Sequence, residues 1–310
     1  GTVNQKGFID IIRIINEKKL KYGIVYLANL PNIKVPLFVK IFIFFKKQKI
    51  FLKKIKIKFR KQNSKMFDSK LKPDFIFYSG RAIKLKLKNL FSKTKDIISV
   101  PSLDFDFYHQ QDRFQKFKDE DYAVFLDEDN LDHPDIKYHN TKSNVNSNFY
   151  LTELNQYFKK FEKKNKLKII IAGHPKANYD QKKNIFNGRT IIQHETKELI
   201  KNSKSVLLHC STSVSFAILA RKPLLFISSS NYSSEYQYLI EIMSRELGQK
   251  PIDISKKSYS IEVPKLNNDL YSNYELNYLS EYPYGENFLP VWETLNKYLK
   301  NLNNNSRNEY

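Results

Sequence analysis

The chain has 310 residues, 41% of them hydrophobic and 14% aromatic, which is enough for two domains with cores of their own. Its single cysteine, Cys210, excludes an internal disulfide framework and a cysteine-based metal cluster. The net charge of +21 is accompanied by no zinc finger, Gly-rich RNA motif or basic recognition helix, so we expect no nucleic-acid partner. Residues 1–7 show no secretory signal, which favours a cytoplasmic location.

The first part of the chain reads as alternating helix and strands. Residues 8–18 have helical spacing, and several short apolar runs end in polar or turn residues, as parallel strands do. These runs are residues 22–27, 54–59, 74–78, 96–100 and 122–126. The polar stretch 127–148 is typical of a surface connection. We place a domain boundary at its end, which gives a first domain of residues 1–148.

The basic charge is concentrated in one segment. Residues 35–66 contain many Lys, one Arg and no acid, around an intensely apolar run at residues 35–45. That run is shorter than the roughly 20 residues needed to span a bilayer. Lys interleaved with apolar residues suits docking on anionic lipid, since each Lys there adds on the order of 1 kcal/mol. Peripheral contact with the inner face of the membrane is one interpretation, and a coding bias with a buried apolar element is the other.

The second part of the chain has a clearer βαβ pattern. Helices are predicted at residues 149–165, 196–201, 213–220, 235–247 and 289–302, and strands at 167–172, 190–192, 205–208, 223–227 and 252–254. This is the succession of a Rossmann-like domain, which we assign to residues 149–310. The polar tail 303–310 is expected to fray. The sequence therefore predicts an α/β fold with two Rossmann-like domains.

Two groups of residues have the chemistry of a phosphate site. Gly173-His174-Pro175 follows an apolar strand, so the imidazole is expected at the carboxyl edge of the sheet, where open α/β folds bind ligands. Histidine titrates near neutral pH and can donate to a leaving phosphate. Ser211, Thr212 and Ser213 follow another buried strand, and their hydroxyls and N–H groups suit an anion. We expect His209, just before them, to be a core histidine.

These motifs, followed by Lys222-Pro223-Leu224-Leu225, resemble the nucleotide-binding half of bacterial GT-B glycosyltransferases over residues 167–227. The His-Pro and Ser/Thr-Ser pairs are especially similar to those of bacterial sialyltransferases and related transferases of nonulosonic acids, which use CMP-sugars. A similar layout in CDP-glycerol phosphotransferases keeps that class as an alternative, beside transferases of UDP- or GDP-sugars. The resemblance implies two Rossmann-like domains facing a central crevice, the first binding the acceptor and the second the nucleotide-sugar donor.

The sialyltransferases that the chain resembles also carry an acidic pair followed by glycine that supplies the catalytic base. This chain has Asp127-Glu128-Asp129 after a predicted strand, with no glycine. Strand alternation places Asp127 and Asp129 on one side and Glu128 on the other, and we assign Asp127 as base and Asp129 as the second candidate. A solvated acidic loop is the alternative for this triplet.

Other residues near these strands are further candidates. Arg189 and Glu195, at either end of the strand at 190–192, are expected nucleotide or ribose contacts. The second His-Pro pair, His133-Pro134, follows no strand and is not assigned to phosphate. Two acidic pairs, Asp104 with Asp106 and Asp127 with Asp129, could hold a cation in a GT-A enzyme. GT-A enzymes place that motif within an early nucleotide-binding half, whereas the residues suited to phosphate here lie in the later half of the chain.

We therefore expect an inverting transfer of a sialic-acid-like or Kdo-like sugar from a CMP-activated donor. No metal or cofactor is expected, and the acceptor is expected to be a cell-surface glycan or a lipid-linked glycan. A non-catalytic basic binding protein is the alternative from a different class.

Overall fold

The structure is a computed structural model, and it describes residues 14–15, 17–18, 21–27, 31, 73–92, 94–110, 121–133, 143–180, 182, 184–285 and 289–307. The chain divides into two compact units. Unit 1 consists of residues 1–29, 33–103 and 276–310, and unit 2 of residues 30–32 and 104–275. Each unit is built around a parallel sheet, which confirms the α/β class and the two sheet-bearing units expected of a GT-B-like chain.

Unit 2 contains a six-stranded sheet in the order β6-β5-β4-β7-β8-β9. Its strands are β4 (Tyr122–Leu126), β5 (Lys168–Gly173), β6 (Ile191–Gln193), β7 (Ser205–Leu208), β8 (Leu224–Ser228) and β9 (Ile252–Asp253). All the pairs are parallel. The central strands are continuous apolar runs buried on both faces, as parallel strands covered by helices must be.

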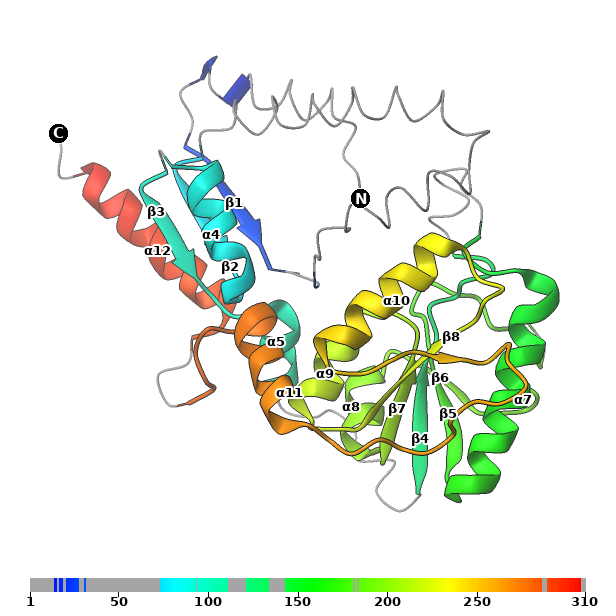
Figure 1. Ribbon diagram of the computed structural model, residues 1–310. Coiled ribbons are helices and arrows are strands. Elements are labelled where there is room, and N and C mark those ends of the chain that lie inside the picture. Colours follow the sequence, from blue (N-terminus) through cyan, green and yellow to red (C-terminus); the bar gives the residue numbers. More distant parts are fainter. Residues whose placement is uncertain are drawn as a thin grey trace. The chain divides into compact units, whose positions relative to one another are not determined.

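The described helices of unit 2 are α5 (Leu103–His109), α7 (Ser147–Asn165), α8 (Thr196–Asn202), α9 (Val214–Leu219), α10 (Ser234–Glu246) and α11 (Asn268–Tyr274). Among them, α7, α8, α9 and α10 connect successive strands, α5 precedes β4 and α11 follows β9. The chain moves from β4 to β5 in one direction and from β7 to β8 in the other, so right-handed crossovers put α7 and α9 on opposite faces. Helix α8 packs against α9 (Figure 1).

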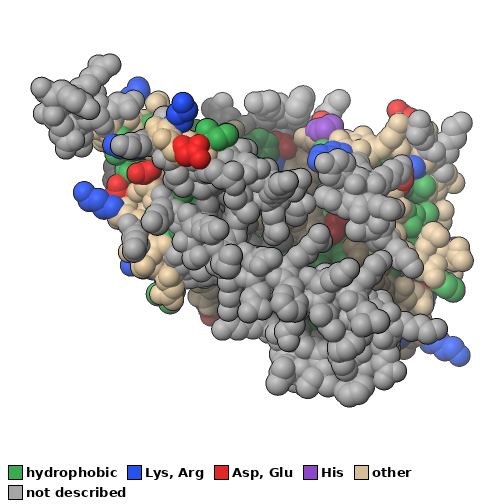
Figure 2. Space-filling model, turned by 90° about the horizontal axis from the view of Figure 1, so that it is seen from above, with side chains coloured by type: hydrophobic (Ala, Val, Ile, Leu, Met, Phe, Trp, Pro, Cys, Tyr) green, Lys and Arg blue, Asp and Glu red, His purple; other side chains and the backbone are tan. Residues whose placement is uncertain are grey.

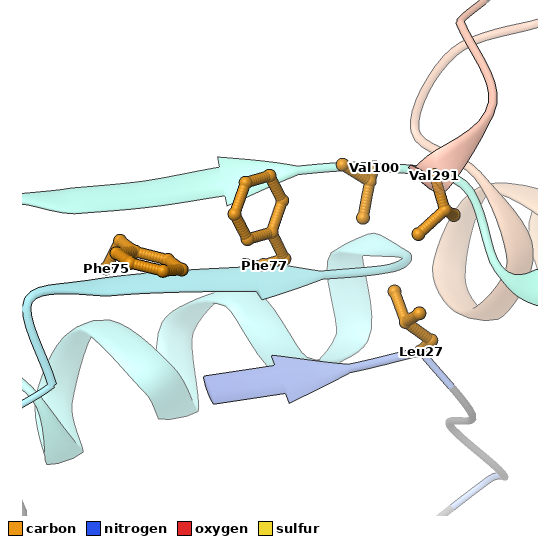
Figure 3. Packing of buried hydrophobic residues seen from close by; sticks show 5 residues of the cluster. All are labelled: Leu27, Phe75, Phe77, Val100 and Val291. Carbon is orange, nitrogen blue, oxygen red and sulfur yellow. The ribbon is translucent and has the colours of Figure 1, made fainter. Parts of the chain in front are cut away.

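Unit 1 has a three-stranded sheet, β1-β2-β3, formed by β1 (Gly23–Tyr26), β2 (Phe75–Tyr78) and β3 (Asp96–Ser99). The longer helices in its described part are α4 (Arg81–Leu90) and α12 (Val291–Arg307), and a π-helical turn at Glu275–Leu279 begins at the last residue of unit 2. Figure 3 shows how Leu27, Phe75, Phe77, Val100 and Val291 pack together from all three strand segments and α12. The chain therefore returns to unit 1 because α12 completes this core.

In the sequence, the two units meet after residues 103 and 275, and not at the expected boundary after residue 148. Strand β4, which we had assigned to the first domain, pairs with β5 and β7 at the centre of the larger sheet. Residues 276–310, assigned to the second domain, belong to unit 1. The reason is that sheet membership is set by pairing and packing partners that are distant in the sequence.

Most predicted elements of the second half coincide with observed ones to within two residues. One correction concerns the tail, because α12 continues to Arg307 where we expected fraying from residue 303. The predicted strand at 54–59 and the basic segment 35–66 lie outside the described residues. Within the predicted helix at 8–18, residues 14, 15, 17 and 18 are described; the first three are helical and residue 18 is in a turn.

None of the helices in the described part of the chain is long and apolar enough to cross a membrane. On the face seen in Figure 2, the coloured basic and acidic side chains are interspersed and do not gather into patches of one sign.

Candidate functional site

The candidate site lies at the carboxyl ends of β4, β5 and β7. The chain runs from β4 through β5 to β6 on one side, then returns to β7 and continues on the other. Strand β4 therefore lies beside the point where the strand order reverses, the position at which open parallel sheets bind ligands. The three predicted motifs, at residues 127–129, 173–175 and 211–213, follow these three neighbouring strands.

A tyrosine hydroxyl joins Asp127 to His174. The Tyr179 hydroxyl donates to Asp127 Oδ2 at 2.5 Å and accepts the backbone N–H of His174 at 2.7 Å. Both candidate residues are thus connected through a side chain that was not predicted. The Gln193 amide donates to the carbonyl oxygens of His174 and Ala177 at 2.8 and 3.0 Å, which ties the turn after β5 to the end of β6.

Gly173 allows Tyr179 to approach. A Cβ at Gly173 would lie 2.7 Å from Tyr179 Cε2 and 3.0 Å from Gln193 Cγ, closer than side-chain carbons normally come. Gly173, which was predicted at the site, therefore contributes by having no side chain, which leaves room for the Tyr179 ring. Pro175, its predicted companion, is exposed.

Asp127 is 7% exposed, and burial raises its pKa to about 6. The hydrogen bond from Tyr179 opposes this increase, while the charge of Asp129 adds to it. Asp129 adopts a left-handed conformation, with φ of 49°, and its carboxylate forms an ion pair with Lys182. Asp127 and Asp129 therefore both contact residues of the segment after β5, although the strand ends at Leu126 and the left-handed Asp129 does not continue its alternation.

Glu128 points to the other side, toward β7. Its Oε1 accepts the backbone N–H of Cys210 at 2.8 Å, and its Oε2 accepts the Tyr236 hydroxyl at 3.0 Å. The Asn130 amide donates to the same tyrosine oxygen at 2.7 Å. Burial raises the pKa of Glu128 to about 7 despite these donors. A solvated acidic loop, the alternative for this triplet, does not describe side chains that are enclosed in this way.

The Ser211 to Ser213 turn connects β7 to α9. Ser211 Oγ accepts the backbone N–H of Ser213 at 3.3 Å, so this serine stabilises the turn itself. Thr212 is exposed, and Ser213 is the N-cap residue of α9 but makes no side-chain capping bond. Helix α9 has only six residues, so the turn offers mainly its hydroxyl groups to a ligand.

His209 is a core histidine, as expected. It is fully buried, its Nδ1 donates to the Ile227 carbonyl at 2.8 Å, and its Nε2 accepts the Tyr150 hydroxyl at 3.1 Å. The carbonyl can only accept, which fixes this neutral tautomer. Burial lowers the pKa of His209 to about 4, so the ring stays uncharged at neutral pH.

Arg189 differs from its expected role. Its guanidinium donates twice to Glu162, at 3.0 and 2.7 Å, and also to Asn155 and to the Phe186 carbonyl. Four of its five N–H donors are used within the unit, so the structure gives it a structural role in place of a nucleotide contact. Glu195 begins α8, and its Oε2 is buried with no hydrogen-bond partner in the described part of the chain.

Three functional candidates were missed by sequence reasoning. Tyr179 and Lys182 lie in an irregular segment with no periodic signal, and they reach Asp127 and Asp129 across more than fifty positions of the chain. His133 was discounted, yet its ring lies 4.7 Å from that of His174, edge to face. The one feature of the sequence that could have identified His133 as a candidate was that it forms a second His-Pro pair with Pro134.

No group of three or more His, Cys, Asp or Glu side chains among the described residues is arranged to hold a metal ion. Asp104 lies in the first turn of α5, where burial raises its pKa and a hydrogen bond with Ser215 opposes that increase. The acidic pair at Asp104 and Asp106 is thus helical.

The fold and site together define an α/β protein with a buried carboxylate, a histidine and a hydroxyl-rich turn at the carboxyl edge of one parallel sheet. No protein-family model matches the sequence, and no curated protein matches it. Among solved structures, Staphylococcus aureus MnaA with UDP matches at 13% identity and a TM-score of 0.42, over 92% of this chain and 76% of that one.

Two further solved structures give weaker or similar scores. A putative UDP-N-acetylglucosamine 2-epimerase from Listeria monocytogenes matches at 13% identity and TM-score 0.40, covering 88% of this chain and 68% of that one. The glycotransferase of kitacinnamycin matches at 8% identity and TM-score 0.30, covering 80% and 82%. All these TM-scores are below 0.5, and the function is therefore argued from the residues of this chain.

Proposed function

We propose that this chain is a GT-B-type enzyme that acts on a nucleotide-activated sugar, and that it transfers an acidic sugar, sialic-acid-like or Kdo-like, from a CMP-activated donor with inversion. The observation that carries the proposal is the connection of Asp127 to His174 through Tyr179, beside the Ser211 to Ser213 turn, at the switch point of a parallel sheet. A candidate base and a set of groups that can donate hydrogen bonds to a phosphate thereby lie on the same carboxyl edge of the sheet.

The roles follow from the chemistry of each group. Asp127 accepts the proton of the acceptor hydroxyl while that oxygen attacks the anomeric carbon, and the bond from that carbon to the CMP phosphate oxygen breaks. The imidazole of His174 and the hydroxyls of Ser211, Thr212 and Ser213 stabilise the charge that develops on the departing phosphate. A pKa of about 6 leaves Asp127 largely ionised at neutral pH, as a base requires.

The acceptor belongs to the same proposal. We assign it as a cell-surface glycan or a lipid-linked glycan, with the basic segment 35–66 meeting an anionic membrane surface. The enzyme would then work on the inner face of the cytoplasmic membrane.

Nucleotide binding is the first test. We expect CMP to raise the thermal unfolding temperature more than CDP, UDP or GDP at equal concentration, because a ligand at 100 times its dissociation constant stabilises by about 2.7 kcal/mol. His174→Ala is expected to weaken CMP binding at least about tenfold, since it removes a contact to the phosphate.

His194→Asn is the matched control, because His194 is exposed at the end of β6 and asparagine tolerates its positive φ of 65°. Preference for CDP or for UDP would instead support the phosphotransferase or the UDP-sugar class. No response to any nucleotide, together with salt-dependent retention on nucleic acid, would support a non-catalytic basic protein.

A second prediction concerns Tyr179. Its hydrogen bond lowers the pKa of Asp127, so Tyr179→Phe should raise that pKa and move the acidic limb of the kcat/KM profile to higher pH. The measurement is CMP release from a CMP-activated acidic sugar across a pH series. Tyr157→Phe is the control, because its buried hydroxyl has no hydrogen-bond partner among the described residues. An unchanged limb in Tyr179→Phe would remove Asp127 as the titrating base.

A further inference from the structure

Glu128, to which no part of the mechanism assigns a role, is hydrogen-bonded to the residue that precedes the Ser211 to Ser213 turn. Its Oε1 accepts the N–H of Cys210, the residue directly before the turn, at 2.8 Å. Glu128 follows β4 and Cys210 follows β7, so this one carboxylate connects the two strands on either side of the switch point. Any ligand phosphate at the turn therefore lies near a carboxylate that hydrogen bonds hold in place.

The surroundings of this carboxylate lack a counter-charge among the described groups. The titratable groups that face it are Asp127 on its own loop, His209 and Cys210 at the end of β7, Tyr150 on α7, Tyr232 before α10 and Tyr236 on α10. Burial keeps the histidine neutral and raises the pKa of the thiol and of the three tyrosines, so only Asp127 is charged at neutral pH, and it is an anion.

We propose that Glu128 positions the phosphate turn through Cys210 and takes up one proton when a nucleotide phosphate occupies that turn. This inference rests on the proposed function, because it places the phosphate at the Ser211 to Ser213 turn. A phosphate brought close to Glu128 and Asp127 adds a third negative charge to an enclosed site, and protonating one carboxylate removes the repulsion.

Glu128 is the carboxylate that gains the proton. Its pKa is already raised to about 7 by burial, above the value of about 6 for Asp127, so it binds a proton more readily. Asp127 is thereby left ionised as the base. A pair of neighbouring carboxylates whose environments separate their pKa values in this way divides the acid and base forms between them.

The sign of the pH dependence follows. A nearby phosphate raises the pKa of Glu128, so binding is linked to proton uptake and is strongest where Glu128 is already protonated. CMP affinity should therefore fall as pH rises through about 7, the pKa of Glu128 in the free protein.

The test is isothermal titration of the full chain with CMP, at about pH 8, where a carboxyl of pKa about 7 is almost fully ionised in the free protein, in buffers that differ in ionisation enthalpy. Wild type is expected to take up close to one proton more per CMP than Glu128→Gln, which keeps an oxygen for the Cys210 N–H. The phosphate of CMP also takes up protons below this pH, but it is present in both titrations, so the difference between the two proteins isolates Glu128. Cytidine, which has no phosphate, should show no difference between the two proteins.

Tyr236→Phe tests the same idea with the carboxylate intact. The Tyr236 hydroxyl lowers the pKa of Glu128, so its loss should move the fall in CMP affinity to higher pH. Equal proton uptake in wild type and Glu128→Gln, or an unmoved pH dependence in Tyr236→Phe, overturns this inference and leaves the proposed function intact. Failure of wild type to bind CMP overturns the proposed function and this inference with it.

Discussion

Asp127→Asn is expected to lower turnover by roughly 10²- to 10⁴-fold while CMP affinity stays close to that of wild type. The asparagine keeps the shape of the side chain and an oxygen for the Tyr179 hydroxyl, which donates to Asp127 at 2.5 Å. It removes only the group that accepts the proton. His174→Ala should instead damage turnover and CMP affinity together, because the imidazole is assigned to the leaving phosphate.

The pH profile of wild type gives the same assignment independently. Burial raises the pKa of Asp127 to about 6, so kcat/KM should fall as pH drops below about 6 and the base becomes protonated. Steady-state release of CMP measures both the turnover of the variants and the pH dependence of kcat/KM. Asp129→Asn is the comparison variant, since Asp129 pairs with Lys182 on the same side. Normal turnover in Asp127→Asn with loss in Asp129→Asn would transfer the role of base to Asp129.

Phe125→Ala should lower the free energy of unfolding of the chain by roughly 3–5 kcal/mol. Phe125 is 0% exposed on β4, the strand that lies between β5 and β7. Its ring lies 5.0 Å from that of Phe158, 6.2 Å from that of Phe186 and 5.4 Å from that of His209, so truncation leaves a cavity bounded by α7 and β7.

Urea unfolding followed by far-UV circular dichroism measures this loss. Phe149→Ala, on the first turn of α7, is the matched control, because Phe149 is 48% exposed and its truncation should change stability by less than about 1 kcal/mol. Equal losses for the two variants would show that β4 is not the packing centre of unit 2.

The local chemistry of the site could be predicted from the sequence. Apolar runs that end in turn residues identified β4, β5 and β7, and such runs also place the next residues at the carboxyl edge. That was sufficient to place His174 and the Ser211 turn at the carboxyl edge of one sheet, to place Asp127 at the carboxyl end of a strand assigned to the other domain, and to identify His209 as a core residue. Each of these inferences depends on neighbours within a few positions along the chain.

The sheet to which each strand belongs, and the partner of each polar side chain, were decided by the tertiary structure. Strand β4 lies at the centre of the second sheet because β5 and β7 pair with it, and α12 returns to unit 1 because Val291 packs with Leu27 and Phe75. Tyr179 reaches Asp127, and Glu162 engages Arg189, only after the chain has folded. Contacts between residues so far apart leave no periodic pattern in the sequence, since they depend on backbone positions set by the whole unit.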